Sequence, residues 1–80
     1  MASFYPYLYQ AALALCIDAR IKAGLTQAQL AERFGQPERF VASYESGDRL
    51  IDPAEYIAIC RAIGVDPYEL LQKAEKEVGN

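Results

Sequence analysis

The chain is poor in the residues that most often build metal and catalytic sites. Its 80 residues include no histidine, and its two cysteines, Cys16 and Cys60, form no CxxC motif. A zinc centre or a dithiol redox motif therefore has no ligand set here. Each cysteine lies in an apolar stretch with helical spacing, so we expect buried free thiols and no metal or other cofactor.

Candidate nucleophiles lack a partner base. The chain has three serines, Ser3, Ser43 and Ser46, and no histidine that could activate them. Its carboxylates are scattered at predicted helix starts and on hydrophilic faces, where solvation accounts for them. We expect no catalytic residues and no enzymatic activity.

Long apolar runs are also missing. The longest, from Ala11 to Ile17, has seven residues, whereas a membrane-spanning helix needs about 20. No lysine or arginine precedes Arg20, so the positively charged start of a secretory signal is absent. We expect a cytoplasmic protein with no membrane partner.

Positive charge is in short supply. Eight lysines and arginines face 11 acidic residues, which gives a net charge of −3. Because cationic side chains supply most of the non-specific affinity for nucleic acid, this balance counts against DNA binding.

Hydrophobic residues make up 52% of the chain, with no linker, repeat or low-complexity segment. This composition predicts one all-α domain over residues 1–80, with five helices separated by short turns. Gly24, Gly35, Gly47 and Gly64 are the expected stops. The predicted starts are Pro6, Thr26, Pro37, Pro53 and Pro67.

Three of these starts carry explicit capping signals. Thr26 and Gln29 have the spacing of a capping box, and Leu25 and Leu30 that of a hydrophobic staple. The segments 52–55 and 66–69 each read Asp-Pro-x-Glu, which is typical of a helix start.

Helical spacing predicts the core. The fifth helix should also carry Glu69/Lys73 and Lys73/Glu77 pairs on its hydrophilic side. The residues expected to face inward are Tyr9, Leu13, Cys16, Ile17, Arg20, Ile21, Leu30, Ala31, Phe34, Val41, Tyr44, Tyr56, Ile59, Cys60, Ile63, Leu70, Leu71, Ala74 and Val78.

Three stretches within residues 16–71 form a specific series: Arg20 with the following AGLTQAQLAERFG, the VxxYExG end of the third helix, and DPAEYIAICRAIGVDPYELL. With this series, residues 16–71 resemble the Cro/C1 (XRE-type) helix-turn-helix family. The resemblance implies a five-helix, lambda-repressor-like fold with the helix-turn-helix at about residues 26–45. It also implies double-stranded DNA as a partner.

The resemblance assigns roles to three residues near the helix ends. Gln27 should touch a DNA phosphate, helped by the exposed N–H groups of its helix. Arg20 should pair with Glu45. Both of these charges lie on otherwise apolar stripes, and a buried charge persists only when it is paired.

By the same resemblance, the third helix enters the major groove. Arg39 suits guanine, while Glu38 suits a cytosine amino group or holds Arg39 in place. Phe40 either contacts a thymine methyl or lies half-buried against the second helix, and Arg49 is the loop residue suited to a phosphate. The full candidate set is Thr26, Gln27, Gln36, Glu38, Arg39, Phe40, Ser43 and Arg49, of which Ser43 is a weak contributor.

Residues 36–51 hold two positive and three negative side chains. About two cationic contacts predict a slope of log K against log salt of only about −2, so one copy should bind DNA poorly. This deficit favours a homodimer on two half-sites.

The expected dimer surface is the aromatic N-terminal extension, residues 1–10, with a second apolar stripe on the first helix: Phe4, Tyr5, Tyr7, Leu8 and Leu15. The alternative is that this helix packs on the fifth helix within one copy.

Two functions fit these observations. The first is a small bacterial or phage DNA-binding regulator that acts as a homodimer. The alternative is an acidic protein-interaction module on the same fold, that is, a partner-binding regulator or antitoxin-like protein with a regulatory protein partner and little DNA affinity.

Overall fold

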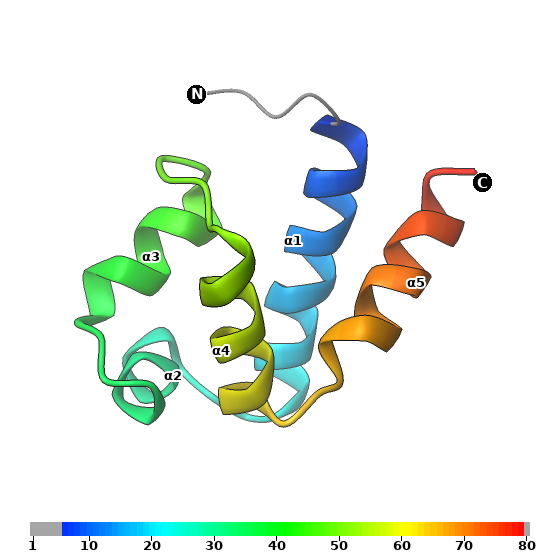
Figure 1. The fold of residues 1–80 in the computed structure, drawn as a ribbon. Coiled ribbons are helices and arrows are strands. Elements are labelled where there is room, and N and C mark those ends of the chain that lie inside the picture. The colour runs from blue at the N-terminus through cyan, green and yellow to red at the C-terminus, as the bar shows by residue number, and fades with distance from the viewer. Residues whose placement is uncertain (1–5, 80) are drawn as a thin grey trace.

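Five α-helices form the computed structural model, in which residues 6–79 are described (Figure 1). The predicted all-α class and the number of helices are confirmed for these residues. The helices are α1 (Pro6–Lys22), α2 (Gln27–Arg33), α3 (Glu38–Ser46), α4 (Pro53–Ile63) and α5 (Pro67–Glu77).

Capping side chains fix the helix starts as predicted. Thr26 and Gln29 form both hydrogen bonds of a capping box, and so do Asp52 and Glu55. The Asp66 carboxylate accepts the first free N–H groups of α5. Pro37 differs slightly, since it is the cap with an extended backbone and α3 begins at Glu38.

Two glycines make the chain reversals on either side of α3. Gly35 has φ of 76° and Gly47 has φ of 91°, in the left-handed region that costs other residues energy. Gly47 caps the C-terminus of α3. These two turns set the length and the direction of α3.

The core consists of two clusters. The larger joins α1 to α2, α3 and α4, and the smaller joins α1 to α4 and α5. Cys16 and Cys60 are buried free thiols in the smaller cluster, as predicted. A hydrogen bond with Cys60, followed by burial, raises the pKa of Cys16. Since Cys16 is also 2% exposed, we expect an unreactive thiol at neutral pH.

Two residues predicted to face inward are exposed instead. Ile21 is 60% and Leu71 is 39% exposed. The α1 sequence is apolar on several faces, and its neighbours cover only part of its circumference. On α5, Leu70 and Leu71 are adjacent and point about 100° apart, so only Leu70 is buried.

The ion pairs expected on α5 are not formed. Within residues 6–79, neither Glu69/Lys73 nor Lys73/Glu77 comes within 4.0 Å, whereas Lys22 and Asp18 on α1 are 2.9 Å apart. Exposed pairs of this kind gain little over hydration, so their geometry is weakly determined.

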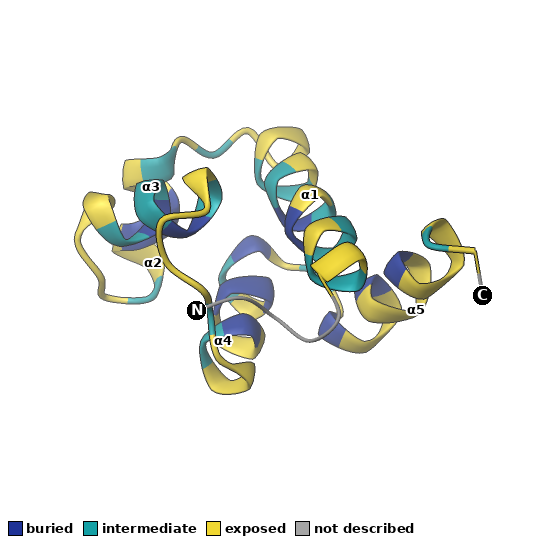
Figure 2. Ribbon diagram, turned by 90° about the horizontal axis from the view of Figure 1, so that it is seen from above, coloured by how far each residue is buried: buried dark blue, intermediate teal, exposed yellow. Residues whose placement is uncertain are grey.

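α1 lies between the α2–α3 pair and α5, with α4 packed across them (Figures 1 and 2). The first and fifth helices therefore do pack together within one copy, which was one of the two alternatives for α1. None of the described helices combines the length and the apolar character needed to cross a bilayer.

Candidate nucleic-acid interface

A tightly packed junction holds α3 against α2. Leu30 and Ala31 from α2 and Val41 and Tyr44 from α3 are all at most 1% exposed and belong to one cluster. The turn between the two helices passes through Gly35. Since buried contacts cover one face of each helix, the orientation of α3 is fixed and its other face is left to solvent (Figure 2).

The start of α3 is open to solvent. Gln36, Glu38 and Arg39 are exposed. Among the described residues, neither Glu38 nor Arg39 has an oppositely charged partner within 4.0 Å. The ion pair through which Glu38 would hold Arg39 in place is thus not formed. The N–H donors of the Arg39 guanidinium are therefore available to a ligand.

A largely buried ion pair ties α1 to the end of α3. Arg20 Nε and Nη2 donate to the two Glu45 carboxylate oxygens at 2.7 and 3.0 Å. The side chains are only 12% and 7% exposed. Arg20 Nη1 also donates to the Leu25 carbonyl at 2.8 Å. The pair expected from the sequence therefore lies in a largely buried setting, where each of the three Arg20 nitrogens donates a hydrogen bond, as a buried charge requires.

Gln27 joins the same network. Its Nε2 donates to Glu45 Oε1 at 2.9 Å, a contact that the sequence did not indicate. An amide nitrogen carries two N–H donors, so one remains for a phosphate. The hydrogen bond to Glu45 thereby orients the Gln27 side chain.

Phe40 is packed rather than free. Its ring meets Phe34 and Tyr44 edge to face, each with centroids 5.8 Å apart. The Arg49 guanidinium lies over its face, 4.5 Å from the centroid. Of the two alternatives for Phe40, the half-buried one is observed, because the ring packs against Phe34 and Tyr44 and has the Arg49 guanidinium over one face.

Arg49 is not the free cation that its sequence position implied. Its Nη1 and Nη2 donate to the two carboxylate oxygens of Glu55 at 3.1 and 2.5 Å. These hydrogen bonds raise the pKa of Arg49 and lower the pKa of Glu55. The sequence predicted only a capping role for Glu55. Its second role depends on the path of the 47–52 loop, which no local pattern reports.

The two hydroxyl candidates are engaged locally. Ser43 Oγ donates to the Phe40 carbonyl at 3.0 Å, and Thr26 Oγ1 accepts the Gln29 N–H at 3.0 Å. Each oxygen keeps a further lone pair, and Thr26 in addition keeps its O–H donor. They are therefore minor contributors to any interface.

Pairing changes the charge balance of the 36–51 segment. Glu45 is neutralised by Arg20 and Arg49 by Glu55. Three charged side chains in the segment have no ion-pair partner within residues 6–79, namely Glu38, Arg39 and Asp48. Arg39 is the only cation of these three, so it dominates what the surface can offer to an anion.

The predicted dimer surface is only partly described. Phe4 and Tyr5 lie outside the described residues. Tyr7 is 81% exposed, whereas Leu15 packs against the cluster of Cys16 and Leu70. The second apolar stripe of α1 is thus used in part within one copy.

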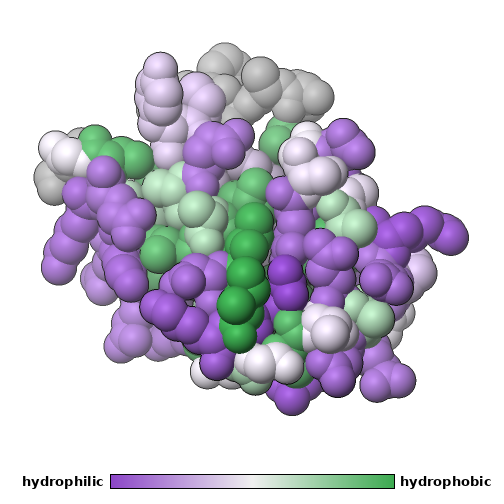
Figure 3. Space-filling model, turned by 180° about the vertical axis from the view of Figure 1, so that it is seen from behind, coloured by the Kyte–Doolittle hydropathy of each residue, from purple (hydrophilic) through white to green (hydrophobic). Residues whose placement is uncertain are grey.

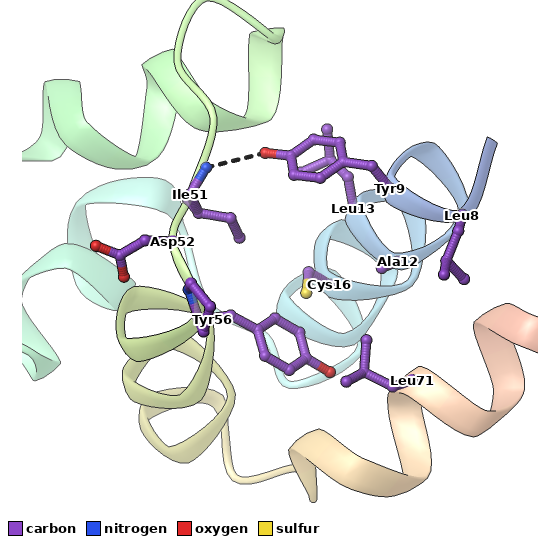
Figure 4. Close-up of a pocket in the computed structure, with 10 residues that line it drawn as sticks. Leu8, Tyr9, Ala12, Leu13, Cys16, Ile51, Asp52, Tyr56 and Leu71 are labelled. Atoms are coloured by element: carbon purple, nitrogen blue, oxygen red, sulfur yellow. Dashed lines mark hydrogen bonds between the residues drawn. The ribbon is translucent and has the colours of Figure 1, made fainter. Parts of the chain in front are cut away.

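Leu8 lines an apolar cavity of about 320 Å³ between α1, α5 and the start of α4. Figure 4 shows Cys16 and Leu71 at its wall, with the Tyr9 hydroxyl accepting the Ile51 N–H at 3.1 Å. On the face seen in Figure 3, apolar side chains form a narrow band bordered by hydrophilic ones.

Comparison with known proteins matches this arrangement. The helix-turn-helix family model matches residues 17–70. A solved XRE-family like protein from Pseudomonas syringae pv. tomato str. DC3000 is 47% identical and superposes with a TM-score of 0.84. The match covers 88% of this chain and 85% of that one. Comparison with curated proteins gave no match.

The chain belongs to the XRE helix-turn-helix family. It therefore belongs to a family of DNA-binding transcription regulators, which are typically not enzymes. In this XRE protein, α2 and α3 are the two helices of the motif, and α1, α4 and α5 form the scaffold that orients them.

Proposed function

We propose that this XRE protein is a sequence-specific transcriptional regulator that binds double-stranded DNA as a homodimer, with α3 in the major groove. The observation that carries the proposal is the exposed first turn of α3. It presents an unpaired Arg39 on a helix held by the buried α2–α3 junction. A rigid helix with a free guanidinium is suited to bidentate hydrogen bonding with guanine.

Phosphate contacts would come from the start of α2. Thr26 is exposed, and Gln27 keeps one amide N–H beyond the one bonded to Glu45. Such contacts position a protein on the duplex without reading its sequence. Gln36 and Glu38 are exposed beside Arg39 and complete the proposed base-facing set.

Dimerisation follows from the small number of cationic contacts in one copy. Two copies on a pseudo-palindrome would double them. The molecule measures 34 × 26 × 19 Å, which allows two copies side by side with their third helices about one helical turn, roughly 34 Å, apart.

We place the protein in the cytoplasm of a bacterium or its phage. Its similarity to a Pseudomonas protein supports this setting.

The acidic surface favours a second candidate, a protein-interaction module with little DNA affinity. Its support is the charge of the 36–51 segment, where Glu38 and Asp48 outnumber Arg39 once the ion pairs are counted. The protein would then be a partner-binding regulator or antitoxin-like protein, and a regulatory protein with a basic surface would complement it. The two candidates differ in whether the protein binds DNA at low salt.

The test begins with selection of duplexes from a random pool at low salt, followed by anisotropy titration of the selected sequence. Arg39→Ala should weaken binding to that sequence by about 1–3 kcal/mol and remove the preference over a scrambled duplex. Lys76→Ala, which removes one positive charge from the exposed side of α5, is the control and should keep the preference. A wild-type protein that selects no duplex would overturn the proposal and favour the interaction module.

A further inference from the structure

We propose that Glu55 competes with DNA phosphate for the Arg49 guanidinium. This competition weakens the binding of the α3–α4 loop to the DNA backbone. The inference rests on the proposed function, and it assigns to Glu55 a role in setting DNA affinity. It concerns a residue on α4, away from the base-facing turn of α3.

The Arg49 guanidinium is held on two sides. Both of its terminal nitrogens donate to the Glu55 carboxylate, and its flat face lies on the Phe40 ring. The two-pronged geometry is the one that an arginine would also use for a phosphate. A phosphate that binds this Nη1–Nη2 edge therefore has to replace the carboxylate.

Glu55 cannot follow Arg49 towards a phosphate. Its Oε1 also accepts the Asp52 N–H at 2.9 Å, and its own N–H donates to Asp52 Oδ1 at 2.7 Å. This capping box anchors the carboxylate at the start of α4. The side chain of Glu55 is 25% exposed and that of Arg49 is 42% exposed, so a phosphate can reach the pair from solvent.

The consequence is a low non-specific affinity. Phosphate contacts are sequence-independent, and each adds about 0.9 to the salt slope. With Arg49 already neutralised, Arg39 is the remaining cation of the 36–51 segment, and it is the strongest candidate for a base contact beside the uncharged phosphate contacts proposed for Thr26 and Gln27. Glu55 thereby raises the ratio of specific to non-specific binding at the expense of total affinity.

Glu55→Gln separates the two roles of the residue. Glutamine at the third helical position keeps the capping box but cannot form the ion pair. Asp48→Asn is the matched control, since it removes one negative charge beside Arg49 that forms no ion pair with it. The double variant Arg49→Gln/Glu55→Gln tests whether any gain passes through Arg49.

The first measurement is anisotropy with a random-sequence 30-base-pair duplex over a range of KCl concentrations. Glu55→Gln should tighten binding about three- to fivefold at low salt and steepen the log–log salt slope by about 0.9. Asp48→Asn should leave the slope unchanged, and the double variant should lose the gain. An equal gain in Glu55→Gln and Asp48→Asn, or an unchanged slope, would overturn the inference.

The second measurement needs no DNA. The Arg49 Nε–H resonance is followed by NMR during titration with inorganic pyrophosphate. It should respond at several-fold lower concentration in Glu55→Gln than in the wild-type or Asp48→Asn protein. If Glu55→Gln responds at the lower pyrophosphate concentration but none of the proteins binds a duplex in the first measurement, the proposed function fails and the competition stands. If wild type and Glu55→Gln respond alike, the competition is refuted even where DNA binds.

Discussion

At the scale of single residues, the nearly buried Arg20–Glu45 pair is the most sensitive point of the structure. Three chain segments converge on it, because the Leu25 carbonyl and the Gln27 amide are bonded to the same two side chains. Removing one partner leaves an uncompensated charge in a nearly dry site. The other partner cannot be rehydrated without opening the contact between α1 and α3.

We therefore expect Glu45→Ala to lower the free energy of unfolding by about 3–5 kcal/mol, measured by urea denaturation. The double variant Arg20→Met/Glu45→Leu serves as the control. It should lose less than the two single changes together, since no charge is left unpaired. A loss below about 1 kcal/mol in Glu45→Ala would show that water reaches Arg20 freely.

The Arg49–Glu55 pair gives a pH-dependent contribution to stability. The pKa of Glu55 is lower in the folded protein than its ordinary value of 4.5, so the ion pair stabilises the fold fully above that value. The contribution is lost as the pH falls through the lowered pKa. The Tm difference between wild type and Glu55→Gln should accordingly shrink between pH 6 and pH 2.5. A difference that stays constant over this range would contradict the assignment.

At the scale of helices, the start of α2 is set by its cap. Thr26 Oγ1 satisfies the Gln29 N–H, and Gln29 Oε1 returns a bond to the Thr26 N–H. We expect Thr26→Ala to cost about 1 kcal/mol of stability, measured by thermal or urea unfolding. Gln29→Ala removes only the return bond and should cost less. Equal losses would mean that the two bonds act as one unit.

Helix boundaries were predictable because their causes are local. Caps at Thr26, Asp52 and Asp66 and a stop at Gly47 depend on residues within one turn, and the structure confirms each. Burial was predictable only where one stripe is apolar. On α1, several faces are apolar, so the exposure of Ile21 depended on which sides its neighbours cover.

At the scale of the whole molecule, the proposed function requires a second copy of the chain. The exposed Tyr7 and the cavity-lining Leu8 make the start of α1 the proposed contact. We expect wild-type protein to sediment as a dimer at micromolar concentration and Tyr7→Ser/Leu8→Ser to dissociate. Tyr68→Ser is the control, since Tyr68 is similarly exposed on α5. A wild type that stays monomeric at all concentrations would remove this surface from consideration.

The sequence by itself determined the helices, their caps, most of the core and the family. All of these follow from spacing within a few turns or from motifs that run along the chain. The tertiary structure alone decided which charges are free, because pairing depends on loop paths and on helices distant in sequence. In the folded chain Gln27 donates a hydrogen bond to Glu45, the Arg49 guanidinium lies over Phe40, and Arg49 forms an ion pair with Glu55. Arg39 is therefore the one cation of the 36–51 segment without an ion-pair partner among the described residues.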